Sequence, residues 1–238
     1  MLSSMNDPIH TGKTILAFDT ALTGCNVALM TAEGDDYSEQ VETQRDQAKL
    51  LVPMTQDILK RAELTYQDID LIVVTNGPGS FTGLRLGLAT ARALALALDC
   101  PVIGINSFDF VRAHYQKNGI RDPLLVVLET KRQDFYVQAY DGSGQPQGDP
   151  VATSAANIAE YYDLLAYKIG GDCIERVVAD VGLDNLSVLG NIMQPDPILL
   201  CYLALSRPLP EAGERPEPLY LRGADVSLPK NLPRQLER

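Results

Sequence analysis

Short apolar runs near the start of the chain predict β-strands. Thr14–Asp19 and Gly24–Met30 are both rich in aliphatic residues, and the four residues between them suit a hairpin turn. Asp36–Glu42 is more polar and predicts a weaker third strand that extends the hairpin into a meander. We therefore expect the chain to begin with antiparallel strands.

Helical spacing first occurs in Gln47–Glu63, where apolar residues recur at three- and four-residue intervals. Pro53 lies inside this segment and should either start the helix proper or kink it, because an interior proline costs about 3 kcal/mol. Asp70–Thr75 predicts a buried strand, and Gly83–Leu98 predicts a second helix.

A strand over Pro101–Ile105 follows, and Ser107 is the predicted N-cap of a helix that runs to about Gln116. An antiparallel start followed by strand–helix–strand crossovers predicts an α/β fold. Its sheet should be mixed, with helices on the faces.

The second half of the chain repeats this order in reduced form, although no motif recurs. Leu124–Glu129 and Asp134–Tyr140 predict strands, and Asp141–Gly144 predicts the turn after them. Weaker signals predict a helix over Ala155–Leu165, a strand end at Ile169–Asp172, a short strand over Ser187–Leu189 and a short helix over Pro197–Leu205.

These patterns predict two related lobes between terminal segments. Residues 207–238 hold six of the fifteen prolines and should form an extended tail. We expect a disordered N-terminal extension over 1–13, a first lobe over 14–106, a second, reduced lobe over 107–206 and a proline-rich C-terminal segment over 207–238.

Composition narrows the class of partner. The 238 residues carry a net charge of −11, and residues 207–238 hold six basic and five acidic residues, so the first 206 residues carry −12. A polyanion such as tRNA is repelled by this body. Cys25, Cys100, Cys173 and Cys201 are too far apart in sequence for a zinc motif and are expected to be free thiols in a reducing compartment. No uninterrupted apolar run of about 18 residues and no secretory signal are found, so we expect a cytoplasmic chain without a membrane span.

The segment Asn76–Gly87, between a predicted strand and a predicted helix, is the strongest motif. Glycines before a helix N-terminus can form a phosphate cradle. The Walker lysine is absent, since Leu84 follows Gly83, and the acid that a dinucleotide fingerprint requires after the next strand is absent at Ile105–Ser107. A serine-hydrolase elbow does not fit either. A rigid strand-to-helix turn without a ligand remains the alternative.

The helix after this loop is apolar on nearly every side. Gly83, Gly87, Ala91 and Ala95 recur every four residues, and leucines occupy half of the remaining positions. A surface helix normally has one apolar stripe, so this helix requires cover on two sides. The sheet covers one side of the helix. The Gln47–Glu63 helix or another protein covers the second side.

A complete catalytic set is missing. His10 and His114 are the two histidines, so a His-x-x-x-His metal pair is impossible. A Ser–His–acid triad could use only His114, and nothing in the sequence places it near Ser80. Asp19 ends the first strand, where phosphate-transferring enzymes of the actin-like class place a catalytic acid, but the following turn has no glycine before Gly24. Asp19 is therefore equally compatible with a role in bracing the strand end. We predict no catalytic and no metal-ligating residue.

Four segments together resemble the TsaB (YeaZ) family of bacterial tRNA threonylcarbamoyladenosine biosynthesis proteins: Ile15–Thr20, Gly77–Gly87, Lys131–Val137 and Pro218–Arg222. The resemblance covers most of residues 14–226. It implies an actin-like ATPase (ribonuclease H-like) fold of two related lobes, with mixed sheets flanked by helices and the second lobe reduced.

The resemblance also implies a function and partners. The chain would be a non-catalytic activator of the transferase TsaD, which places a threonylcarbamoyl group on N6 of the adenosine beside the anticodon in tRNAs that read ANN codons. We expect a heterodimer with TsaD, a homodimer when the chain is alone, the ATPase TsaE on the complex, and tRNA contact only through the complex. No intrinsic cofactor is expected, although ATP or ADP could be shared at the partner interface.

We expect two sets of functional residues, one for docking a partner and one for a nucleotide or anion at the interface. The helices Gln47–Glu63 and Gly83–Leu98 should form the docking surface, through Leu50, Leu51, Met54, Ile58, Gly83, Gly87, Ala91 and Ala95. An interface nucleotide or anion would border Asp19, Thr20, Gly77, Pro78, Gly79, Ser80, Thr82, Gly83 and Arg85.

The chain departs from the family at two places. Gln47–Lys49 replaces a histidine and an acid found in many members, and Glu129–Arg132 replaces an Asp-Ala-Arg sequence. Neither change removes a catalyst, but the first could alter partner specificity. The rival hypothesis is a stand-alone small-molecule kinase or ATPase of the actin-like fold; a peptidase is disfavoured because metal ligands are missing.

Overall fold

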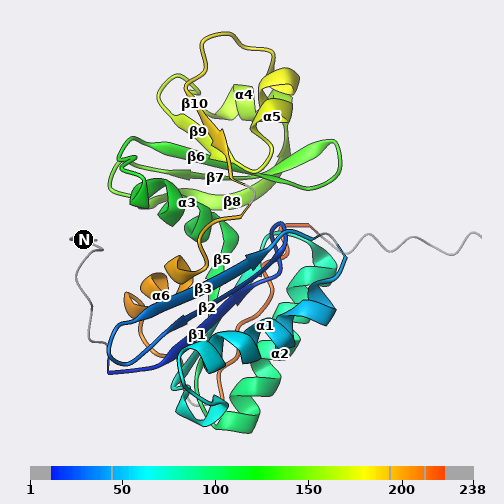
Figure 1. Ribbon diagram of the computed structural model, residues 1–238. Helices are drawn as coiled ribbons and strands as arrows, with labels where there is room; N and C mark the ends of the chain where they lie inside the picture. The colour runs from blue at the N-terminus through cyan, green and yellow to red at the C-terminus, as the bar shows by residue number, and fades with distance from the viewer. Residues whose placement is uncertain (1–11, 44, 193, 212, 223–238) are drawn as a thin grey trace, which may run out of the picture.

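The computed structural model describes residues 12–222 except 44, 193 and 212. Most of the predicted N-terminal extension over 1–13, and all of the chain beyond Arg222, lie outside the described residues. The described part forms two lobes, one above the other in Figure 1, and each lobe is built on a five-stranded sheet.

The first sheet confirms the predicted meander and crossovers. Its strand order is β3-β2-β1-β4-β5. β1, β2 and β3 pair antiparallel, whereas β4 and β5 continue the sheet parallel to β1. The strands span Ile15–Asp19 (β1), Cys25–Met30 (β2), Asp36–Val41 (β3), Leu71–Gly77 (β4) and Val102–Asn106 (β5).

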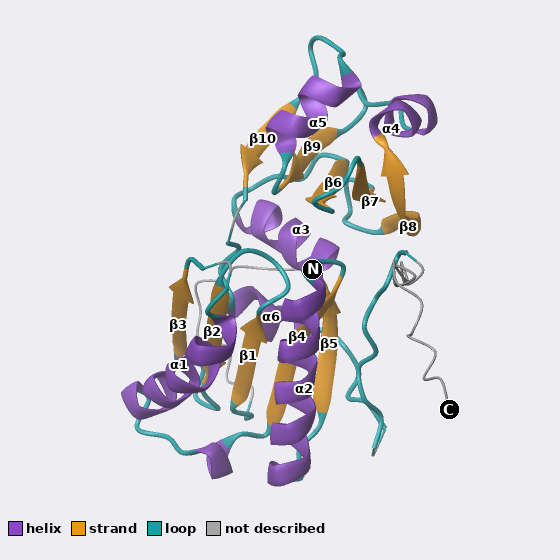
Figure 2. Cartoon of the chain, turned by 90° about the vertical axis from the view of Figure 1, so that its right-hand side faces the viewer, coloured by secondary structure: helices purple, strands orange, loops and turns teal. Residues whose placement is uncertain are grey.

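Helices cover both faces of this sheet because β1 is apolar at every position but its last. Leu16 and Phe18 belong to a core shared with α1 (Gln47–Arg61) and α2 (Phe81–Leu98), which lie together on one face in Figure 2. Ile15 and Ala17 belong to a second core on the opposite face. That core includes α3 (Ser107–Lys117) and α6 (Ile198–Leu205).

The second sheet repeats the first. Its order, β8-β7-β6-β9-β10, has the same sequence of antiparallel and parallel pairings. The elements are β6 (Leu124–Glu129), β7 (Asp134–Tyr140), β8 (Pro146–Ser154), β9 (Lys168–Gly171) and β10 (Val188–Asn191), with α4 (Ala155–Tyr161) and α5 (Ile174–Val181) as short helices. The chain has the predicted actin-like ATPase fold of two related lobes, with the second reduced.

The duplication also reveals a short repeat in sequence. β1 ends at Asp19 and is followed by Thr20, and its counterpart β6 ends at Glu129 and is followed by Thr130. The expectation that no motif recurs is therefore wrong. Two residues are too short a match to find until the topology shows which strands correspond.

Other differences from the prediction have local causes. β8, α5 and the 3-10 turn η1 (Tyr66–Asp68) were not predicted; β8 has prolines and a glycine, which only an edge strand tolerates. The helix after β8 ends at Tyr161 rather than Leu165. Asn106, not Ser107, caps α3, because its side-chain oxygen accepts the Asp109 N–H at 2.7 Å.

The segment after α6, here called the C-terminal strap (residues 207–222), returns to the first lobe. Arg207 donates to the carbonyl oxygen of Gly104 in β5, and the N–H of Leu219 donates to the carbonyl oxygen of Asn76 at the end of β4. Figure 2 shows the strap beside β5. The sequence placed α6 in the second lobe, but α6 packs on the sheet of the first lobe. The lobe boundaries at 106 and 206 therefore remain a prediction from sequence.

α2 is long and apolar enough, by length and composition, to cross a membrane. The search for an uninterrupted apolar run missed it because Arg85 and Arg92 interrupt the sequence. A core helix meets the same criterion, and one side of α2 packs on β4.

Candidate functional site

A cleft of about 540 Å³ lies where the two lobes meet at the loop after β4. One wall is the loop and first turn of α2, from Pro78 to Arg85. The opposite wall is the β6–β7 turn of the second lobe, Glu129–Arg132, with Tyr136. The end of the strap, Leu219–Arg222, completes the cleft.

The loop glycines lie against the chain's own β1–β2 turn. A Cβ on Gly83 would lie 1.8 Å from the carbonyl oxygen of Thr20, and a Cβ on Gly79 would lie 2.4 Å from that of Ala21. The N–H of Ser80 donates to the Ala21 carbonyl oxygen at 2.8 Å, and the Thr20 hydroxyl donates to the Gly83 carbonyl oxygen at 2.7 Å. The space that these glycines leave is thus filled by backbone. In the chain by itself, this motif behaves as the rigid turn that was the alternative to a phosphate cradle.

Asp19 is sealed inside the first lobe. Its carboxylate accepts hydrogen bonds from the Thr75 hydroxyl at 2.6 Å, the Asn26 amide at 3.1 Å, and the N–H groups of Ala21 and Leu22. Burial raises the pKa of this carboxyl, although these hydrogen bonds oppose the shift. Asp19 and Thr20 are buried and do not line the cleft, which corrects their assignment to an anion site at its surface.

The charged residues that line the cleft are mostly cationic. Of the predicted loop residues, Pro78, Gly79, Ser80, Thr82 and Arg85 line it, whereas Gly77 and Gly83 do not. The sequence-based site missed the contribution of the second lobe and the strap. The cleft's charged side chains are Arg85, Lys131, Arg132 and Arg222 against the single acid Glu129.

Aromatic rings connect the first lobe to the strap. The guanidinium of Arg85 lies over the Phe81 ring at 3.9 Å, and the Phe81 ring packs on Tyr220 with centroids 5.8 Å apart. Arg222 forms an ion pair with Asp134 at the start of β7. The Tyr-Leu-Arg element that supported the family resemblance therefore bridges the two lobes.

Glu129 lines the cleft in the second-lobe wall, and Asp172 lies behind it. Glu129 forms an ion pair with Arg176 at 3.2 Å, and the N–H of Glu129 donates to Asp172 at 2.8 Å. Burial raises the pKa of Asp172 to about 6. Both carboxylates are engaged within the lobe, so neither is poised as a base facing the cleft.

Among residues 12–222 as described, no group of three or more His, Cys, Asp or Glu side chains could hold a metal ion. His114 lies half-buried on α3, where burial lowers its pKa, and it is not among the residues that line the cleft. His10 lies outside the described residues.

The predicted docking residues lie mostly inside the chain. Leu51, Met54, Ile58 and Ala91 are buried in the core between the sheet and the two helices, with Ala95 at its edge and Leu50 partly buried. Gly83 and Gly87 are also buried, since their face packs on Thr20 and β4. The buried members of this set do not reach the surface of the folded chain, whereas Leu50 does in part, and contact of the set with a partner stays a prediction. The outward faces of the same helices expose Val52, Phe81 and Leu96, at 48%, 54% and 75%.

Comparisons with known proteins converge on one group. A family model described as TsaD, tRNA N6-adenosine threonylcarbamoyltransferase, matches residues 39–193. The chain is 28% identical over 221 residues to the tRNA threonylcarbamoyladenosine biosynthesis protein TsaB of Escherichia coli (strain K12), an alignment that covers 87% of this chain and 94% of that protein. The protein of the same name from Buchnera aphidicola subsp. Baizongia pistaciae (strain Bp) is 31% identical over 125 residues, which is 52% of this chain and 56% of that protein.

Among solved structures, YeaZ from Pseudomonas aeruginosa superposes with a TM-score of 0.74 at 25% sequence identity. The match covers 88% of this chain and the whole of that chain. Both lobes and their order are therefore shared with a protein of about this size.

Proposed function

The chain belongs to the family described as TsaD, tRNA N6-adenosine threonylcarbamoyltransferase, and from that premise we propose that it is a non-catalytic subunit that activates a TsaD transferase. Its similarity to proteins named TsaB and YeaZ supports a role in the biosynthesis of tRNA threonylcarbamoyladenosine. Transfer to N6 of the adenosine beside the anticodon is the step that the partner would perform.

One observation carries the non-catalytic assignment. Asp19 stands at the end of the first strand, facing the lobe boundary, yet all its hydrogen bonds are to its own lobe. A general base must reach the proton that it abstracts, and this carboxylate is fully enclosed. The second-lobe counterpart, Glu129, is held by Arg176. These arrangements support a stabilising role for both acids.

The outward face of α1 and α2 is the proposed docking surface. On α2, Ala89, Ala93 and Ala97 are exposed beside Leu96, so another helix could approach this side closely. On α1, Val52 and Pro53 are exposed in the same way. We propose that this face binds TsaD, or a second copy of the chain when TsaD is absent.

The charge of the chain bears on where tRNA and a nucleotide would bind. A chain with net charge −11 repels tRNA, so tRNA contact is assigned to the complex. Binding of the ATPase TsaE to the complex follows from the family resemblance alone. The cationic cleft would border any ATP or ADP shared at the interface, through Arg85, Lys131 and Arg132. The rival function, a stand-alone kinase or ATPase, needs a free acid at this cleft, whereas Glu129, which lines it, is paired with Arg176.

Co-purification tests the docking surface. Ala93→Arg places a long charged side chain on the outward face of α2 and should abolish binding to TsaD and self-association in size-exclusion chromatography with light scattering. Ala179→Arg is the matched control, because Ala179 is exposed on α5 of the second lobe. If folded Ala93→Arg still binds TsaD like the control, the docking surface lies elsewhere.

A further inference from the structure

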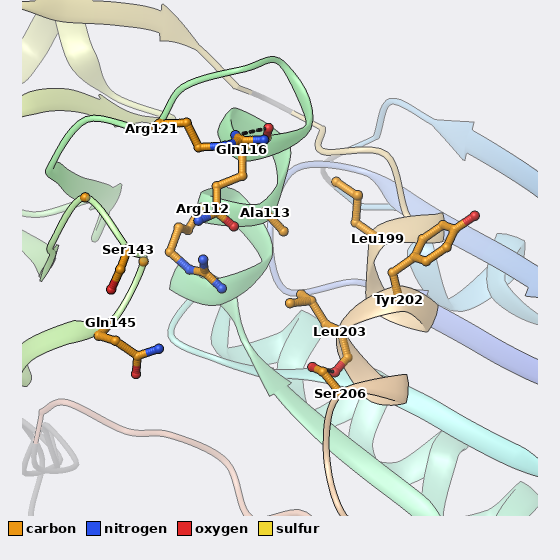
Figure 3. Close-up of a pocket in the computed structure, with 12 residues that line it drawn as sticks. Arg112, Ala113, Gln116, Arg121, Ser143, Gln145, Leu199, Tyr202, Leu203 and Ser206 are labelled. Atoms are coloured by element: carbon orange, nitrogen blue, oxygen red, sulfur yellow. Dashed lines mark hydrogen bonds between the residues drawn. The ribbon is translucent and has the colours of Figure 1, made fainter. Parts of the chain in front are cut away.

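A second cavity, of about 440 Å³, lies between the lobes and shares no lining residue with the cleft described above. Three elements from different parts of the chain surround it in Figure 3: α3, the turn between β7 and β8, and α6. Its charged lining residues are Arg112 and Arg121, and no acid lines it. The chain carries a net charge of −11, whereas the charged residues that line this cavity are both cationic.

Arg112 is the least satisfied of these side chains. It is 15% exposed, and its Nε is buried with no hydrogen-bond partner among the described residues. The nearest carboxylate oxygen, on Asp109, is 4.0 Å away. Asp109 already accepts from Arg207 at 2.7 Å and from the Tyr140 hydroxyl at 2.8 Å. Arg112 thus has an ion-pair partner in Asp109 and lies over the Tyr140 ring at 5.3 Å, but its buried Nε–H has no hydrogen-bond acceptor among residues 12–222 as described, which is costly.

Two other side-chain donors around the cavity are unengaged, whereas the hydroxyls of Ser143, Tyr202 and Ser206 donate to other groups of the chain. Within the described part of the chain, no hydrogen bond is made by the side-chain amides of Gln116 and Gln145, and Arg121 donates to carbonyl oxygens rather than to a carboxylate. Because Gly144 has no side chain, the donor groups of Arg112 and Gln116 can lie close to its backbone. A Cβ there would lie 2.5 Å from Nη1 of Arg112 and 2.6 Å from Nε2 of Gln116.

The opposite wall of the cavity is apolar. Leu199 and Leu203 project from α6, and Ala113 completes this side from α3 (Figure 3). A cavity of this volume falls within the range of small-molecule sites, in which a few polar groups orient a ligand against an apolar wall. A guanidinium pairs best with a planar or tetrahedral oxyanion.

We propose that this cavity binds a small organic oxyanion, a carboxylate or a phosphate monoester with a short apolar group. The oxyanion lies on Arg112, with Gln116 and Gln145 beside it, and the apolar group lies against Leu199 and Leu203. Because the β7–β8 turn belongs to the second lobe and α6 packs on the first sheet, the ligand contacts both lobes. Its binding therefore stabilises the folded chain, by an amount that rises with the logarithm of the ligand concentration above the Kd.

Titration calorimetry of the intact chain with monobutyl phosphate, butyrate and inorganic phosphate tests this. We expect saturable, one-to-one binding of monobutyl phosphate or butyrate, with the tighter of the two identifying the oxyanion. Inorganic phosphate should bind more weakly than monobutyl phosphate because it lacks the apolar contact. Arg112→Gln should weaken binding about tenfold or more, since it removes a charge-assisted contact.

Two further variants keep the proposal falsifiable. Gln145→Leu alters an exposed turn residue and should also weaken binding, even if Arg112→Gln does not fold. Arg85→Gln, in the other cleft, should leave the affinity unchanged. Absence of saturable binding by both organic anions would overturn the proposal, as would loss of binding in Arg85→Gln with Arg112→Gln unaffected.

Discussion

At the scale of single residues, buried carboxylates hold the strand ends of both lobes. Asp19 fixes the β1–β2 turn through two backbone N–H groups and reaches β4 through Thr75. Asp172 accepts the N–H of Glu129 and so joins the end of β6 to the start of α5. The sequence showed Asp19 to be compatible with a catalyst or a brace, and only its hydrogen-bond partners distinguish the two.

Asp19→Ala should lower the free energy of unfolding by about 2–4 kcal/mol, because it removes the acceptor of the buried Thr75 hydroxyl and of the N–H groups of Ala21 and Leu22. Urea denaturation followed by circular dichroism measures this. Asp19→Asn retains one acceptor oxygen and should lose less. An Ala variant that unfolds at the wild-type urea midpoint would show that the carboxylate does not brace the turn.

Asp172 makes stability depend on pH. Its folded pKa of about 6 lies above the ordinary value of 3.8, so the folded chain binds this proton more tightly than the unfolded chain. The stability that this proton contributes is complete below about pH 4 and is lost as pH rises through about 6. Asp172→Asn should therefore match wild type at pH 4 and be more stable by about 2 kcal/mol at pH 7.

Urea titrations between pH 4 and pH 7 test this dependence, with Glu175→Gln as an exposed control on α5, the helix that follows Asp172. The control should follow the wild-type pH profile. A constant difference between Asp172→Asn and wild type across this range would contradict a raised pKa.

At the scale of elements, the small residues of α2 are explained by the close packing of this helix on its own lobe. Its repeat of Gly83, Gly87 and Ala91 admits the β1–β2 turn and β4 to the helix backbone. Read from the sequence, the same repeat predicted close approach of a partner. The pattern identified the helix and its need for close packing, but it could not say whether the neighbour belongs to this chain.

Gly83→Ala tests this packing. Alanine normally stabilises a helix by up to about 1 kcal/mol relative to glycine. Here the Cβ would lie 1.8 Å from the Thr20 carbonyl oxygen, so we expect a loss of about 3 kcal/mol or more in thermal or urea unfolding. Gly190→Ala, with no atom within 4 Å of the added Cβ, is the control. Equal stability of the two variants would refute the close contact.

Hydrophobic patterning predicted most strands of both sheets to within two residues, because buried strands carry uninterrupted aliphatic runs. It missed β8, since an edge strand tolerates Pro146 and Pro150, and it missed α5, whose apolar face is short. For the cleft, the loop Pro78–Arg85 was found from its glycines. Lys131 and the strap were not, because their approach to that loop depends on tertiary structure.

At the scale of the whole molecule, one core joins the two lobes. It combines residues of the first sheet, α3, α6 and β6, so the lobes share a hydrophobic interior beneath the cleft. The strap closes the other side through Arg222 and Asp134. The cationic cleft is a local exception on an acidic surface.

The overall charge predicts that the chain does not bind tRNA alone at physiological salt, because phosphate repulsion opposes contact over most of the surface. A gel-shift titration with unmodified tRNA measures this, and the same titration with TsaD present is the control. Sub-micromolar affinity of the isolated chain would contradict the assignment of tRNA contact to the complex.

The most direct test of the central claim is the rate of threonylcarbamoyl transfer to tRNA in a reconstituted reaction with TsaD, TsaE and this chain. We expect no transfer by the chain alone, background transfer when the chain is omitted, and full transfer with wild type or with folded Asp19→Asn. Ala93→Arg should return the reaction to background. Transfer by the chain without TsaD, or an undiminished rate when the chain is omitted, would contradict a non-catalytic activator.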